Sequence, residues 1–255
     1  MAKELSAFDS VAKYAAIGIR RLPHNKWEAH YDLTLDLYSA AAEADGILAN
    51  TDSMQVWYDD VIRHGRNVVD KLRVYFAMSD RMSNDKRIEE AKELCLGVLK
   101  QLKLDIPKSG VVKACIALSC IYKTKKLLAN VEVKTLPLMQ DAEKLAILRL
   151  LDSAAGHAYL IKDKGLLLYC TVKMVQMTLH HGLASYGPSA VAMLSIVVSG
   201  VLNDLESGNI IAEKAVAMAH KINGNATEPR LVFRTWAFCF SYTRPIGHGI
   251  RPFLD

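Results

Sequence analysis

Apolar residues recur along most of this chain at spacings of three and four positions, with polar residues between them. The pattern is clearest between Arg21 and Met54, where it predicts one helix with two apolar faces. The first face contains Trp27, Tyr31, Thr34, Leu35, Tyr38, Ala41 and Ala42. The second contains Leu33, Leu37, Ala40, Ala44 and Leu48. A helix that is apolar on two sides packs between neighbours, so we expect this one to lie inside a stack of helices.

The same pattern predicts helices along the rest of the chain. We expect Ser83-Asn84-Asp85 and Asp141 to cap the helices that follow them, because short polar side chains bind free backbone N–H groups. Leu22-Pro23 and Asn223-Gly224-Asn225 are predicted helix ends. The predicted helices cover about residues 5–21, 27–48, 53–67, 68–82, 88–102, 111–128, 141–159, 166–181, 189–202, 205–222 and 228–242.

Regular stacking is expected to be interrupted between about residues 105 and 140. Val111–Leu128 is predicted to be helical, whereas Asn130–Pro137 is predicted to be extended or looped. No stretch has the alternating pattern of strands. We therefore expect an all-α fold over residues 1–255. It would be a single tetratricopeptide-like α-solenoid of about ten or eleven helices in stacked antiparallel hairpins.

Composition narrows the class of protein further. Hydrophobic residues make up 51% of the chain, which excludes a disordered chain, and the net charge of +5 is mild for this length. The basic runs Lys123–Lys126 and Lys162–Lys164 are typical of solvated helix ends, so we expect no nucleic-acid partner. The longest apolar run, Val191–Leu202, is shorter than the about 20 residues that a membrane span needs.

The N-terminus, MAKELSAFDS, has no apolar signal-peptide core, and we expect a cytoplasmic protein without a membrane span. The five cysteines support this prediction, because they are odd in number and lie mostly in apolar helical runs. We interpret them as small core residues in a reducing compartment. They are Cys95, Cys115, Cys120, Cys170 and Cys239.

No motif predicts catalytic, cofactor-binding or metal-ligating residues, and we expect no cofactor. Gly247-His248-Gly249 lacks the preceding strand of a phosphate-binding loop. His180 and His181 are adjacent and point in different directions on a helix, and no Cys-x-x-Cys pair is present. A nucleophile on a strained turn is also missing. His157 and the tryptophans Trp27, Trp57 and Trp236 are predicted to be core residues.

Several segments, in the same order along the chain, resemble one protein family. They are Leu22-Pro23…Trp27…Tyr31–Tyr38…Ala41–Ala44, Ile88–Leu102, Leu136–Met139, Lys144–Arg149, Gly187–Ala190 and Asp204–Gly208. This set resembles the helical-repeat region of large predicted-ATPase sensor kinases. In that family a serine/threonine-kinase-like domain and an AAA-type, STAND-like ATPase precede the repeats, and a GAF domain and a histidine kinase often follow. No P-loop, kinase catalytic loop or phosphoacceptor motif occurs here, so the resemblance implies that any such activity belongs to other parts of a larger protein.

These observations leave three functional hypotheses. The first is a non-catalytic helical-repeat scaffold or regulatory segment that mediates protein–protein or interdomain contacts in a signalling ATPase or kinase. The second is a stand-alone adaptor that binds a separate protein. The truncated appearance of Pro245–Asp255 argues against it. The third is an all-helical enzyme with an unrecognised site, which no residue pattern supports. The sequence does not indicate which face would bind a partner.

Overall fold

The structure is a computed structural model that describes residues 2–223 and 229–242 of the chain. This part contains twelve α-helices and two short 3-10 helices and no strand, which confirms the all-α prediction. It forms two compact units, Met1–Asp105 and Ile106–Asp255, which we call unit 1 and unit 2. The solenoid arrangement of the whole chain stays a prediction.

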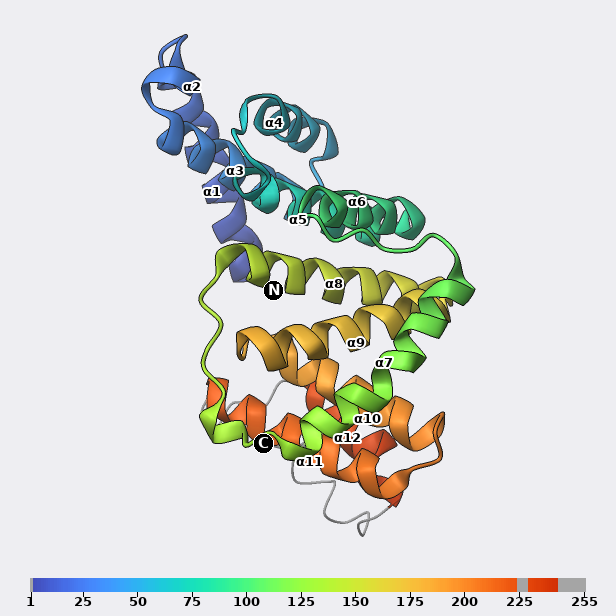
Figure 1. The fold of residues 1–255 in the computed structure, drawn as a ribbon. Coiled ribbons are helices and arrows are strands. Elements are labelled where there is room, and N and C mark those ends of the chain that lie inside the picture. Colours follow the sequence, from blue (N-terminus) through green and yellow to red (C-terminus); the bar gives the residue numbers. More distant parts are fainter. Residues whose placement is uncertain (1, 224–228, 243–255) are drawn as a thin grey trace. The chain divides into compact units, whose positions relative to one another are not determined.

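Unit 1 is organised around α3, as the two apolar faces of that segment predict. Helix α3 packs against α1, α4 and α5, and α6 packs against α5 (Figure 1). A cluster of buried side chains from these helices, including Tyr38, Val61 and Val74, forms the centre of the unit. The helices of unit 1 are α1 (Ala2–Arg21), α2 (Lys26–Ala29), α3 (Tyr31–Ile47), α4 (Thr51–His64), α5 (Val68–Asn84) and α6 (Ile88–Gln101).

The predicted helix that begins near Trp27 is in fact two helices. His30 has φ −137° and ψ 49°, outside the helical region, and separates α2 from α3. The His30 carbonyl oxygen accepts both from the Thr34 N–H at 2.9 Å and from the Thr34 hydroxyl at 2.8 Å, which fixes the start of α3 at the break. The second predicted apolar face is also only partly correct, because Leu33 is 55% exposed. The first face continues to the polar Asp45, which is buried.

Two predictions about helix ends in unit 1 need correction. Ser83 and Asn84 belong to the last turn of α5, and the cap residue of α6 is Arg87, which makes no capping side-chain bond. Asp85 instead pairs with Arg81, one turn earlier in α5. Helix α5 also has an N-terminal cap that the sequence analysis did not predict. The Asn67 side chain accepts from the Asp70 N–H at 2.9 Å.

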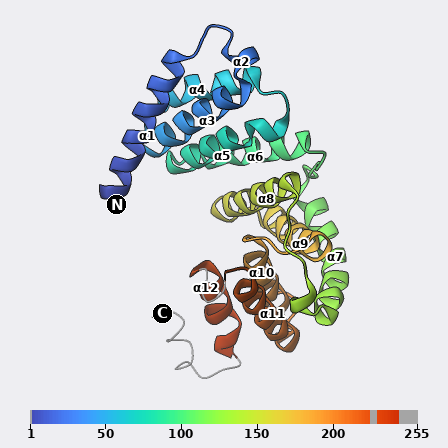
Figure 2. The same ribbon diagram turned by 90° about the vertical axis from the view of Figure 1, so that its left-hand side faces the viewer.

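Unit 2 is built around α9 and α10. Helix α9 packs against α7, α8 and α10, and α10 packs against α11 and α12 (Figure 2). Most residues of α10, which contains most of the longest apolar run of the sequence, are buried. Asp141 caps α8 as predicted, accepting from the Lys144 N–H. The helices of unit 2 are α7 (Gly110–Asn130), α8 (Ala142–Leu160), α9 (Lys164–His181), α10 (Gly187–Gly200), α11 (Leu205–Asn223) and α12 (Pro229–Phe238).

The stretch between α7 and α8 contains one 3-10 turn, Val133–Thr135, and an isolated bridge between Leu138 and Leu183. The Leu183 N–H donates to the Pro137 carbonyl oxygen at 2.7 Å, which ties this stretch to the end of α9. Gly182 makes the connection possible: its φ is +107°, and a Cβ there would lie 2.6 Å from that same oxygen. The prediction of an extended or looped segment is confirmed.

Two lysines of α11 hold the same stretch from the other side. The Lys214 ammonium group donates to the carbonyl oxygens of Leu128, Ala129 and Val131. Lys221, two turns later on α11, donates to those of Val133, Lys134 and Leu136. Each ammonium group has three N–H donors, so Lys214 binds three carbonyl oxygens at and just after the C-terminal end of α7, and Lys221 binds three in the stretch that follows.

Candidate functional site

Unit 2 contains a pocket of about 530 Å³ between helices α8, α9, α10 and α12. Volumes of this order are typical of protein sites that hold a ligand or a set of partner side chains. The residues that line it are Asp152, Ala155, Gly156, Tyr159, Leu167, Thr171, Met174, Ala190, Met193, Ile196, Phe233, Arg234 and Phe238.

The wall of the pocket is apolar and adaptable. Leu167, Met174 and Ile196 come from the sides of α9 and α10 that face one another in the packed unit. Met193 adds a second thioether, and flexible thioether side chains adjust to partners of different shape. Gly156 opens the α8 side, because a Cβ at that position would meet no atom within 4 Å.

Large aromatic side chains line the same pocket but remain exposed. Tyr159 is 68%, Phe233 54% and Phe238 43% exposed. The rings of Phe233 and Phe238 pack edge to face with centroids 5.5 Å apart. Exposed aromatic residues gathered beside a pocket are characteristic of recognition surfaces. Their contact with water costs free energy, and a partner that covers them removes this cost.

Charged groups lie on two walls of the pocket. Arg234 on α12 donates from Nη1 to the Ser189 carbonyl oxygen at 3.0 Å and to the Ser189 hydroxyl, which fixes the position of its guanidinium group. Ser189 is only 2% exposed, so this anchor is part of the core. Asp152 lies on α8. Arg234 thus places a positively charged group beside the apolar wall, and Asp152 places a negatively charged one.

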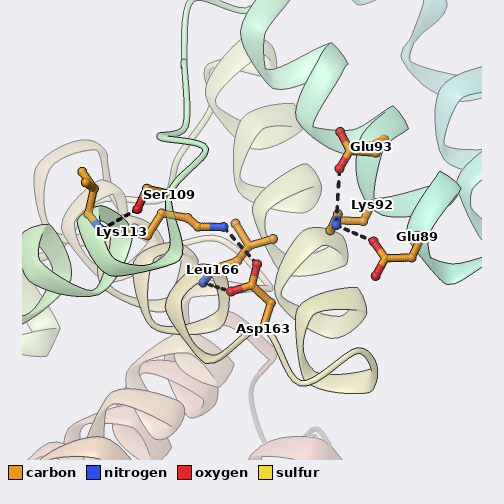
Figure 3. Close-up of polar contacts among 8 residues, drawn as sticks. Glu89, Lys92, Glu93, Ser109, Lys113, Asp163 and Leu166 are labelled. Carbon is orange, nitrogen blue, oxygen red and sulfur yellow. Dashed lines mark hydrogen bonds and ion pairs between the residues drawn. The ribbon is translucent and has the colours of Figure 1, made fainter.

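Other polar clusters in the described residues have structural explanations. The buried Lys113 ammonium group binds Asp163 at 2.9 Å, and the second carboxylate oxygen of Asp163 caps α9 through the Leu166 N–H (Figure 3). In unit 1, Lys92 pairs with Glu89 and with Glu93 on the surface of α6 (Figure 3). These arrangements hold helix ends and helix surfaces together.

An aromatic cluster at the end of unit 1 is also structural. The Trp27 and His64 rings stack with centroids 4.9 Å apart. The centroids of the Trp27 and Tyr38 rings are 5.3 Å apart. The Tyr38 hydroxyl accepts from Lys26 at 2.6 Å, and burial raises its pKa well above the ordinary value for tyrosine. The Arg66 guanidinium group lies over the Tyr31 ring. Lys26 and Arg66 thus supply the positive charges that lie over the rings of this cluster.

His157, Trp57 and Trp236, which the sequence analysis assigned to the core, lie in three different helices. His157 is buried in α8, as predicted, and Trp57 and Trp236 are partly buried and pack against core clusters. Within residues 2–223 and 229–242 no three His, Cys, Asp or Glu side chains are grouped closely enough to hold a metal ion. Gly247-His248-Gly249 lies outside the described residues.

No helix in the described part of the chain is long and apolar enough to cross a membrane. The cysteine interpretation is only partly correct: Cys95, Cys170 and Cys239 are buried, but Cys115 is exposed on α7. The sequence analysis also missed the pocket itself. Its one available signal is weak, namely that Tyr159 and Phe238 fall near helix ends, where exposure is common.

Comparison of this chain with protein-family models, with curated proteins and with solved structures found no match.

Proposed function

We propose that this chain is a non-catalytic helical binding module, and that the pocket of unit 2 is where it holds a protein partner. The observation that carries this proposal is the combination of an apolar pocket with Tyr159, Phe233 and Phe238, whose rings remain exposed beside it. A ligand buried in the pocket alone would leave much of that aromatic surface in water. A protein partner would cover both, and aromatic anchors of this kind dominate the energetics of protein interfaces.

The resemblance to helical-repeat regions of sensor kinases supports a more specific version of the proposal. In this version the module is a scaffold or regulatory arm, and its partner is another domain of a signalling ATPase or kinase. Helical repeats suit this role because they present extended surfaces to peptides and domains. A stand-alone adaptor would use the same pocket for a separate protein. Reading the transcript on both sides of this segment distinguishes the two versions.

Photochemical cross-linking tests the proposal at the pocket itself. Benzoylphenylalanine in place of Phe233 puts a reactive group of similar shape beside the pocket, and the full 255-residue chain is then irradiated in an extract of the source cells. The matched control carries the same group in place of Tyr122, which lies on α7 and is 68% exposed, as Tyr159 is. We expect a discrete protein adduct from position 233 that position 122 does not give.

A second variant makes the result specific to the pocket. Replacing Gly156 with Phe puts a large side chain where an added Cβ meets no other atom, so the adduct from position 233 should be lost while the chain stays folded. An adduct that forms equally from positions 122 and 233, or that survives Gly156→Phe, would contradict the proposal. Turnover of a small molecule that depends on Asp152 or Arg234 would instead support the enzyme hypothesis.

A further inference from the structure

We propose that the outward face of α7 binds the surface of an anionic membrane, with the helix lying in the plane of the interface. This inference is independent of the proposed function, because it concerns a different surface from the pocket of unit 2. It draws on three observations: the exposed apolar face of α7, the lysines at both ends of that face, and the lack of acidic residues on α7 and on α9 beside it.

Helix α7 is apolar on both sides. Its buried residues form one stripe, and the helix packs against α9 and α11 (Figures 1 and 2). A helix that is apolar all round is normally covered on all sides, yet six large apolar side chains of α7 are between 39% and 73% exposed. They extend over about 24 Å of helix, since each residue adds about 1.5 Å. These six are Val111, Val112, Ile116, Leu118, Tyr122 and Leu127.

Lysines lie at both ends of this face. Lys123 and Lys126, in the C-terminal half of α7, are exposed and form no ion pair with a described residue. Lys162 and Lys164, where α9 begins, are also exposed and have no ion-pair partner in the described part of the chain. The Asp163 carboxylate between them binds α7 near its N-terminal end (Figure 3). The two basic runs of the sequence thus lie at opposite ends of one helix.

The helices that carry this surface lack acidic residues. Neither α7 nor α9 contains Asp or Glu. Two carboxylates bind α7, those of Asp163 and Asp204, and each is already paired with a lysine of that helix. Helix α11, the other neighbour, contributes Glu206 and Glu213. The exposed lysines therefore have no counter-charge on α7 or α9, and an anionic partner would supply it.

An anionic membrane surface supplies both kinds of contact. Its acyl region takes the apolar centre of the face, and its headgroups meet the lysines, whose long stems reach from an apolar layer to a charged one. A second copy of the chain fits less well, because any two-fold pairing of α7 faces would bring lysines against lysines. Nucleic acid would neutralise the lysines but would leave the apolar centre without a partner.

Sedimentation with lipid vesicles tests this inference on the full chain. We expect tight binding to phosphatidylcholine vesicles that contain phosphatidylserine, at least about tenfold weaker binding to pure phosphatidylcholine vesicles, and release at high salt. The double variant Lys123→Gln/Lys126→Gln should weaken binding to the anionic vesicles at least about tenfold. The matched control Lys86→Gln/Lys100→Gln removes two exposed lysines of unit 1 and should weaken it less than about twofold.

The apolar contact is tested by a second pair of variants. Val111→Ser/Tyr122→Ser should weaken binding to anionic vesicles at least about tenfold, because these side chains no longer enter the acyl region. The control Val11→Ser/Tyr14→Ser changes the same residue types on α1, where both are also exposed, and should have less than about a twofold effect. Since all four side chains are exposed, we expect every variant to fold, and circular dichroism checks this.

A fluorescent label reports whether α7 itself enters the interface. Cys115 is exposed on α7, and an environment-sensitive fluorophore on its thiol, in a chain with Cys120→Ser, should brighten and shift to the blue when anionic vesicles are added. The same fluorophore on Tyr14→Cys, in a chain with Cys115→Ser and Cys120→Ser, should not respond. A label on Cys115 that stays in water while the chain binds vesicles would overturn the inference.

Further outcomes identify the alternatives. Failure to prefer anionic vesicles, or binding that both α7 double variants leave unchanged, would overturn the inference. So would a dimer in light scattering that Val111→Ser/Tyr122→Ser dissociates, or tighter binding to RNA than to anionic vesicles. A protein adduct from benzoylphenylalanine at position 122 but not at 233 would show that a protein covers this face. Because position 233 reports on the pocket, its adduct tests the proposed function separately.

Discussion

At the scale of single residues, the five cysteines show how burial controls reactivity. Burial raises the pKa of the Cys95 thiol to about 11 and also raises that of Cys239. Cys239 lies against the buried Ser195 hydroxyl at 3.0 Å. Because the thiolate is the reactive form, a raised pKa and lack of access act in the same direction. Cys115 is exposed and lacks this protection.

We therefore expect iodoacetamide at pH 8 to label Cys115 first and to leave Cys95 and Cys239 unmodified in the native chain. Peptide mass spectrometry measures the modified fraction at each cysteine over time. In denaturant all five cysteines should react at similar rates, which serves as the control. Rapid native labelling of Cys95 would contradict the packing of α5 against α6, because the Cys95 thiol contacts the Ser79 hydroxyl across that interface.

Asp204 gives a prediction about pH. Its carboxylate pairs with Lys125 and accepts from the Ser207 N–H at 3.0 Å. The pair with Lys125 is the main reason that the pKa of Asp204 is lowered to about 2. The native state thus favours the charged form, so the stabilisation is complete above the unfolded pKa near 4 and is lost as the pH falls through about 2.

Asp204→Asn keeps a capping acceptor and removes the charge. We expect the variant to melt roughly 1–3 °C below wild type at pH 7. The difference should shrink as the pH falls from about 4 to about 2, because the wild-type carboxyl group then becomes neutral as well. Circular dichroism melts at several pH values measure this. A melting difference that is the same at pH 2 and pH 7 would show that the charge contributes nothing.

At the scale of helices, the connection between α8 and α9 depends on one carboxylate with two roles. Asp163 caps α9 and binds the ammonium group of Lys113, whose side chain is only 7% exposed. The sequence predicts a break at Lys162–Gly165, and the structure has one between Leu160 and Lys164, where α9 already begins. The sequence does not predict the ion pair, because Lys113 lies 50 positions away in a run that looks like an ordinary amphipathic helix.

Replacing Asp163 should lower the unfolding free energy more than replacing Lys113. Asp163→Asn keeps an acceptor for the cap but leaves a buried ammonium group without its counter-charge, and we expect it to cost about 2–3 kcal/mol of unfolding free energy. Lys113→Met removes the buried charge itself and should cost less than about 1 kcal/mol. Urea unfolding of the two variants measures the difference. Equal costs, or a larger cost for Lys113→Met, would contradict this account.

The helices themselves were largely predictable, and their exact ends were not. Apolar spacing located α10 and α11 because burial on one or more faces leaves a direct trace in the sequence. Capping is ambiguous, since Ser, Asn and Asp are also compatible with the last turn of a helix, as Asn84 is in α5. His30 could not be recognised as a break, because its conformation depends on contacts of Thr34 and Lys26 rather than on its own type.

At the scale of the whole chain, the structure has two compact units, with the boundary between Asp105 and Ile106. The sequence analysis placed its irregular stretch at the same point but expected a single repeat domain. We expect residues 1–105 and 106–255, expressed separately, each to be helical and to unfold cooperatively. Limited proteolysis of the full chain should cleave first in the segment 102–109 between α6 and α7. Fragments that are both unfolded would favour a single cooperative domain.

The pocket could not be predicted from the sequence for a physical reason. Phe233 and Phe238 occur in an amphipathic segment that also contains the buried Leu231 and the partly buried Trp236, so their spacing alone suggests core positions. Only the packing of α12 against α10 leaves these rings exposed beside Met193 and Ile196. Sites formed by several helices depend on such tertiary contacts, whereas hydrophobic periodicity reports on one helix at a time.

The most direct test of the central claim is methyl NMR of the full chain with ¹³C-labelled methionine, during titration with the protein partner identified by cross-linking. Met174 and Met193 line the pocket, while Met54 lies in the core of unit 1 and serves as the internal control. We predict that the Met174 and Met193 methyl resonances shift in a saturable way and that Met54 stays in place. Saturable binding that leaves both pocket methionines unchanged would show that the recognition surface lies elsewhere on the chain.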